Sequence, residues 1–164
     1  MKTTYAKFVT IVPLVIGALG VSFAHAQQAT ATSGDVKWIN APAPLPRGAK
    51  LAMLQGDLAK PEAFAFRLKL PAGYQLKPQS SPAIDRMIVV SGAFNLGTGE
   101  KFDRARTVPL YTGYVHWPNK SPYFAFTKEE TVIEIQGIGP WAVNYVNSTD
   151  DPMKKKQVSS SAIQ

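Results

Sequence analysis

Few side chains in this sequence are suited to nucleophilic, acid–base or metal chemistry. The chain has no cysteine, and its two histidines are His25 and His116. Histidine titrates near neutrality and can act as an acid or a base, but the face that His116 occupies depends on a strand register that the sequence does not fix. No serine lies in a glycine elbow with an identifiable base. The sequence therefore offers no nucleophile–base–acid set.

Polar side chains recur at defined spacing between Gly73 and Gly92. Five residues separate Gly73 from Gln79, one separates Gln79 from Ser81, three separate Ser81 from Asp85, and six separate Asp85 from Gly92. This spacing resembles the first metal-binding motif of the cupin family. The glycines fit turns at the two ends of a strand pair.

A second, looser resemblance to the cupins lies downstream. Gly113 precedes Pro118 with one residue fewer between them than in the usual pattern, Lys120 replaces the next glycine, and Tyr123 lies at the ligand position. Further stretches similar to small exported bacterial cupins are residues 82–86, 90–97, 137–141, 145–147 and 150–152. The resemblance covers residues 36–156 and implies an all-β fold, a cupin-type double-stranded β-helix or jelly-roll barrel.

The resemblance also implies a site in which three histidines and a glutamate surround one divalent ion. Here the four positions hold Gln79, Ser81, Asp85 and Tyr123. Glutamine and serine are neutral oxygen ligands, aspartate is one methylene shorter than glutamate, and a tyrosine would have to bind as a phenolate. A calcium or magnesium site would need several carboxylates, and only Asp85 is evident. We therefore predict no metal site and no cofactor.

The same four residues, Gln79, Ser81, Asp85 and Tyr123, could still converge inside the barrel. One interpretation is a small-molecule pocket in which they bind a substrate or ligand. The other is a remnant cluster that satisfies its own hydrogen bonds, with the Tyr123 hydroxyl bonded to Gln79 or Asp85.

Two functions follow from these interpretations. The preferred one is an exported cupin-domain protein without the usual metal, which binds a small molecule or serves as an interaction module. The alternative is a metal-independent or variant-metal enzyme, isomerase-like or lyase-like, that acts on a sugar-like or organic-acid substrate. In that case Asp85 and Tyr123 would act as base and acid.

Short strands between proline and glycine turns are predicted to position these side chains. Residues 64–70 and 131–136 alternate apolar and polar side chains with a period of two, and the polar Glu134 and Gln136 either line the barrel or face solvent. Many short strands with such turns indicate a sandwich or a closed barrel. The predicted strands are Val36–Ile39, Leu51–Leu54, Phe64–Leu70, Met87–Ser91, Phe94–Leu96, Tyr114–Trp117, Tyr123–Phe126, Thr131–Gln136 and Ala142–Val146.

The two ends of the sequence differ from its middle. Residues 1–26 have the pattern of a cleavable secretory signal peptide, in which two lysines precede an apolar run and Ala-His-Ala fits the cleavage site. The prediction is a periplasmic or secreted protein with no stable membrane anchor after cleavage at Ala26. Residues 27–35 are interpreted as a flexible leader, 36–149 as the barrel and 150–164 as a polar, disordered tail.

The charge balance argues against a nucleic-acid partner. The sequence has 18 basic and 11 acidic residues, but two of the lysines lie in the predicted signal peptide and Lys154–Lys156 lie in the tail. The predicted barrel is thus only mildly basic and lacks a lysine–arginine stripe. The cupin resemblance makes a homodimer the expected assembly. Without cysteine, a packed core must supply the stability.

Overall fold

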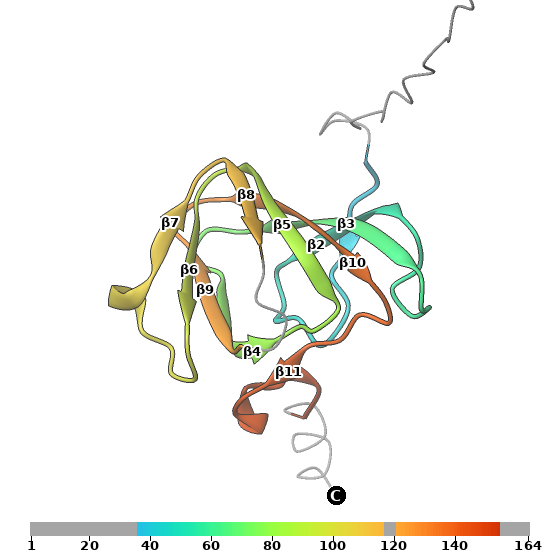
Figure 1. The fold of residues 1–164 in the computed structure, drawn as a ribbon. Helices are drawn as coiled ribbons and strands as arrows, with labels where there is room; N and C mark the ends of the chain where they lie inside the picture. The colour runs from blue at the N-terminus through green and yellow to red at the C-terminus, as the bar shows by residue number, and fades with distance from the viewer. Residues whose placement is uncertain (1–35, 117–120, 155–164) are drawn as a thin grey trace, which may run out of the picture. The chain divides into compact units, whose positions relative to one another are not determined.

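The computed structural model describes residues 36–116 and 121–154, whose strands form two antiparallel sheets (Figure 1). The first sheet has the order β1-β2-β3-β10-β5-β8 and the second has the order β11-β4-β9-β6-β7. The elements are β1 (Ile39–Asn40), β2 (Lys50–Gln55), β3 (Ala63–Leu70), β4 (Gln75–Ser80), β5 (Ile84–Ser91), β6 (Phe94–Thr98), the 3-10 turn η1 (Arg104–Arg106), β7 (Val108–Leu110), β8 (Gly113–His116), β9 (Tyr123–Thr127), β10 (Thr131–Ile138), β11 (Asn144–Tyr145) and the 3-10 turn η2 (Ser148–Asp150). Strands distant in sequence are neighbours in each sheet, which confirms the predicted all-β jelly roll. Within the described ranges, no helix has the length and apolar character needed to cross a membrane.

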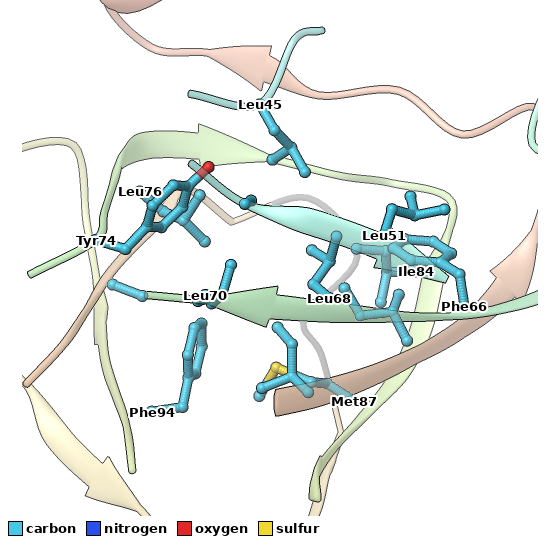
Figure 2. Packing of buried hydrophobic residues seen from close by; sticks show 14 of the residues in the cluster. Leu45, Leu51, Phe66, Leu68, Leu70, Tyr74, Leu76, Ile84, Met87 and Phe94 are labelled. Atoms are coloured by element: carbon cyan, nitrogen blue, oxygen red, sulfur yellow. The ribbon is translucent and has the colours of Figure 1, made fainter. Parts of the chain in front are cut away.

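The hydrophobic core lies between the two sheets. Along β3, every second residue from Phe64 to Leu70 is a buried aromatic or leucine, as the two-residue period of the sequence predicts. Figure 2 shows Leu68 of β3, Met87 of β5 and Phe94 of β6 gathered around one interior. Because both sheets contribute to this single cluster, side chains that point inward from either sheet meet there.

The polar face of β10 lies on the outside of the first sheet. Glu134 accepts hydrogen bonds from Arg67 Nε on the paired strand at 3.0 Å and from Gln136 Nε2 at 2.9 Å. The neighbouring residues Ile133 and Ile135 are buried in the core. Of the two orientations open for Glu134 and Gln136, the structure therefore has the one that points away from the barrel interior.

Strands β4 and β7 are absent from the sequence-based prediction, for different reasons. β4 is mostly polar and contains Pro78, which has no N–H to donate to a ladder. A register shift between Leu76 and Gln79 leaves Pro78 without a paired residue in β9, and its carbonyl accepts from Val146 N at 2.9 Å. β7 is only 3 residues long, too short for an alternating pattern to be recognised.

The segment after β6 covers the outer face of the second sheet. The Phe102 ring lies 5.5 Å from the buried Phe124 ring, and the Arg104 guanidinium lies 4.8 Å from the centre of the Phe126 ring. Gly97 of β6 lies against the same aromatic group: a Cβ there would come within 2.4 Å of the Phe124 ring. The second sheet thus has a smaller aromatic cluster outside the main core. The Phe124 ring of this cluster packs directly against Gly97.

We expect Gly97→Ala to destabilise the protein by about 1–3 kcal/mol, because the added methyl forces a fully buried ring out of position. Urea unfolding followed by circular dichroism measures the free energy of unfolding. Thr98→Ala, at the exposed neighbouring position, is the control and should change it by less than about 0.5 kcal/mol. Equal effects of the two substitutions would show that Phe124 moves aside at no cost.

Candidate functional site

Three of the four candidate residues meet inside the barrel. Gln79 lies directly opposite Tyr123 in the β4–β9 ladder, and Ser81 follows the end of β4. Gln79 Nε2 donates to the Tyr123 hydroxyl at 3.1 Å, and that hydroxyl donates to Ser81 Oγ at 3.3 Å. All three side chains are at least 96% buried. They form one hydrogen-bonded chain, named here the interior polar chain.

A β-bulge in β4 turns Gln79 toward the interior. Leu76 and Gln79 both point inward although they are three positions apart, because two residues of β4 lie opposite one residue of β9 at the register shift. In a regular strand, residues three apart would face opposite sides. The irregularity that admits Pro78 into the strand therefore also places the amide of Gln79 in the core.

Asp85 is not part of this site, and its predicted place in the barrel is wrong. On β5, Ile84 pairs with Gly137 and Arg86 pairs with Gln136, so that Asp85 is the extra residue of a second bulge. Asp85 and Arg86 are both exposed, while the flanking Ile84 and Met87 are buried. The structure therefore separates Asp85 from Tyr123, and the predicted hydrogen bond of the Tyr123 hydroxyl is made to Gln79.

Several other predictions fall on residues outside the described ranges. The signal peptide at residues 1–26, the leader at 27–35 and the end of the tail at 155–164 are among them, and so is Trp117. For His116 the structure gives the backbone pairing with Arg86 in the β5–β8 ladder, and its side chain is outside the description. The part of the tail that is described begins with Asp150, the last residue of η2.

An apolar cavity adjoins the interior polar chain. Its walls are aliphatic and aromatic side chains of both sheets, and the polar groups among them come from Gln79, Ser81, Tyr123 and Trp141. The space open to the centre of a water-sized molecule is about 20 Å³. A volume of roughly 10–15 Å³ on this measure holds one water molecule, so a larger guest requires one of the walls to move.

Two buried polar atoms of the cavity walls lack a hydrogen-bond partner among the described residues. They are the acceptor Gln79 Oε1 and the donor Trp141 Nε1. Leaving such a group unpaired costs about 1–3 kcal/mol, and native proteins rarely retain one without a reason. Neither atom is therefore satisfied by another described group of the protein.

Among the residues that the structure describes, no charged side chain lines the cavity. Burial raises the pKa of Tyr123, although its hydrogen bonds with Ser81 and Gln79 act in the opposite direction. Tyr123 is therefore a neutral phenol at physiological pH. A neutral phenol donates a hydrogen bond but does not act as a base or as an anionic metal ligand.

The residues at the cupin ligand positions do not fit the family's metal. Gln79, Ser81 and Tyr123 present neutral oxygen and nitrogen atoms, and Asp85 faces outward. Transition metals in such barrels need imidazole and carboxylate ligands that converge. Among the residues that the structure describes, no group of three or more His, Cys, Asp or Glu side chains is placed to hold a metal ion.

One wall of the cavity comes from an irregular loop, residues 41–49, between β1 and β2. Its Leu45 is buried and contacts the cavity. Two tyrosine hydroxyls hold the loop from outside, Tyr74 bonding the Pro46 carbonyl at 2.6 Å and Tyr145 the Pro44 carbonyl at 2.8 Å. Within the loop, Ala41 N donates to the Ala49 carbonyl at 2.9 Å and Leu45 N to the Pro42 carbonyl at 3.2 Å. Burial raises the pKa of both tyrosines, so both hydroxyls remain protonated donors.

Sequence reasoning did not identify Leu45 or Trp141 as site residues. A leucine between prolines has no signal beyond a turn, because prolines mark loops without indicating what the loop covers. Trp141 follows Gly139-Pro140 and lies in the stretch 137–141, which the sequence distinguishes only by its resemblance to the cupins. Its indole N–H is the available signal, since a buried tryptophan normally finds a hydrogen-bond acceptor.

Solved structures of other proteins share this architecture. The polyketide cyclase RemF from Streptomyces resistomycificus matches with a TM-score of 0.59 and 16% identity, over 75% of this chain and 88% of that chain. An acetylacetone dioxygenase from Acinetobacter johnsonii matches with a TM-score of 0.55 and 11% identity, over 92% of this chain and 88% of that chain. An RmlC-like cupin from Shewanella frigidimarina matches with a TM-score of 0.50 and 12% identity, over 66% of this chain and 87% of that chain.

The fold is that of the cupins. No protein-family model and no curated protein matches the sequence, and at these identities the structural likeness concerns the fold alone. The solved structures with this fold include a cyclase and a dioxygenase, so the fold by itself does not select an activity. The function must therefore be argued from the interior polar chain and the cavity.

Proposed function

We propose that this cupin binds a small, uncharged molecule inside its barrel and does so without a metal ion. The observation that carries the proposal is the unpaired Gln79 Oε1, an acceptor in a fully buried side chain that lines an apolar cavity. Binding sites for small molecules combine apolar walls with a few fixed polar groups. The interior polar chain supplies such groups, since Tyr123 and Ser81 hold the Gln79 amide in place.

The composition of the cavity walls supports an uncharged guest. Moving an isolated charge into an apolar space is very costly unless a partner neutralises it, and none of the described residues that line the cavity is charged. The alternative enzymatic function rests on Asp85 and Tyr123 as base and acid. It lacks support because Asp85 is exposed on the outside of β5. We therefore favour binding over catalysis.

Metal content after purification without chelators or added metal tests whether the protein lacks a metal ion, as we propose. We expect far less than one transition-metal ion per chain by inductively coupled plasma mass spectrometry, and no change with Tyr123→Phe. Asp85→Asn, at an exposed position, is the matched control. One tightly held ion per chain that Tyr123→Phe removes and Asp85→Asn leaves in place would overturn the metal-free proposal.

Small probes of one shape and different charge test whether the barrel binds an uncharged molecule. Isobutanol and isobutyl chloride are uncharged, whereas isobutylamine and isobutyrate are charged at pH 7. We expect the uncharged probes to shift the amide resonances of cavity residues in two-dimensional NMR titrations, and the charged probes to leave them unchanged. Failure of every uncharged probe to reach these residues would contradict the proposal, as would equal binding of the charged ones.

A further inference from the structure

We propose that the guest is an alcohol: its hydroxyl binds between Gln79 and Trp141, and its apolar part takes the place of the Leu45 side chain. This inference rests on the proposed binding function and names the class of molecule. It comes from two features of the cavity, the pair of unsatisfied atoms and the wall that the loop residue Leu45 contributes.

The two unsatisfied atoms have complementary polarity. Gln79 Oε1 can only accept a hydrogen bond and Trp141 Nε1 can only donate one, and both are buried in residues of the same cavity. A hydroxyl is the smallest organic group that both donates and accepts. A carboxylate could not donate to Gln79, an ammonium group could not accept from Trp141, and a hydrocarbon would leave both atoms unpaired.

Two contacts fix the position of Trp141. Its ring makes an edge-to-face contact with the buried Phe66 ring at 5.4 Å, and its backbone N–H donates to the Leu58 carbonyl at 2.8 Å. Gln79 is fixed by its hydrogen bond to Tyr123. Both groups are therefore pre-organised, which reduces the entropy lost when a guest binds.

The movable wall is Leu45 rather than a strand. The cavity has room for the centre of one water-sized molecule, so the carbon part of an alcohol needs additional space. Leu45 belongs to an irregular loop, and the Tyr74 and Tyr145 hydroxyls that hold this loop bind its carbonyls without fixing the leucine side chain itself. An isobutyl group has the shape of a leucine side chain and would fill the space that Leu45 vacates.

The test compares isobutanol with isobutyl chloride, which has the same carbon skeleton and cannot donate a hydrogen bond. Dissociation constants are measured by NMR titration for the wild-type chain and for Leu45→Ala, which opens the space permanently. We expect isobutanol to bind Leu45→Ala at least about tenfold more tightly than the wild type. It should also bind this variant about a hundredfold more tightly than isobutyl chloride does, the equivalent of the two hydrogen bonds that the chloride does not make.

Trp141→Phe and Gln79→Met in the Leu45→Ala background separate the hydroxyl from the carbon skeleton. Each keeps most of the side-chain volume and removes one polar partner, so each should weaken isobutanol about tenfold and leave isobutyl chloride unchanged. Asp85→Asn should alter neither. If Leu45→Ala does not fold, the same comparison is made with Leu45→Val.

The outcomes distinguish this inference from the proposed function. Equal binding of isobutanol and isobutyl chloride would overturn the alcohol assignment and leave the binding function in place. Equal affinity of isobutanol for the wild type and for the enlarged variants would overturn the role of Leu45. Cavity resonances that respond to neither probe in any variant would overturn both the alcohol inference and the proposed function.

Discussion

Gly137→Ala is expected to abolish the stable folded barrel. A Cβ at this position in β10 would lie 1.8 Å from the Ala83 carbonyl oxygen, which accepts the hydrogen bond of Ile138 N at 3.1 Å. The obstacle is backbone rather than the tip of a flexible side chain, so the chain before β5 must move and that hydrogen bond must lengthen. We expect a loss of at least about 4 kcal/mol, a large part of the roughly 5–15 kcal/mol that stabilises a domain.

Soluble yield and urea unfolding measure this effect, and Gly73→Ala is the matched control. Gly73 has a φ of +78° but no atom within 4 Å of its Cβ position, so alanine there introduces only backbone strain, on the order of 1–2 kcal/mol. The protein should tolerate the control and fail with Gly137→Ala. A Gly137→Ala protein that unfolds within about 1 kcal/mol of the wild type would contradict the packing around β10.

The fold could be predicted from the sequence because its strongest signals agree with one another. The alternation in residues 64–70 and 131–136 gave β3 and β10, which are paired over their whole length in the structure. The same period also assigned Ile133 and Ile135 to one face, and both are buried. A pattern that extends over several residues survives small errors at its ends, and such patterns indicated a sandwich or a barrel. The jelly roll itself was implied by the resemblance of residues 36–156 to the cupins.

The site was less predictable because it depends on two single-residue irregularities. Counting along the motif placed Gln79, Ser81 and Asp85 together, but a bulge in β4 turns Gln79 inward and a bulge in β5 leaves Asp85 outside. A one-residue shift reverses the face of every later side chain in a strand. Pro78 is a local signal for the first bulge, whereas the sequence around Asp85 contains no comparable one.

Alkaline pH is expected to destabilise the protein steeply, and Tyr123→Phe should remove part of that slope. Burial raises the pKa of Tyr123 above the value near 10 that it has in the unfolded chain. Below pH 10 both states are protonated, and the tyrosine adds no pH dependence. Above pH 10 the unfolded chain loses the proton while the folded chain keeps it, so stability falls by about 1.4 kcal/mol per pH unit until the folded-state pKa is reached.

Urea unfolding at pH 8, 10, 11 and 12 measures this slope. Tyr74 and Tyr145, whose pKa values burial also raises, add to the slope of the wild type, so the quantity to compare is the difference between proteins. Between pH 10 and 12 the stability of the wild type should fall more steeply than that of Tyr123→Phe, by up to about 1.4 kcal/mol per pH unit while pH stays below the folded-state pKa. Tyr111→Phe, at a side chain that is 64% exposed, should follow the wild type. Parallel curves for the wild type and Tyr123→Phe would mean that burial does not raise the pKa of Tyr123 in the folded protein. The inference that the cavity favours an uncharged guest would then lose its support.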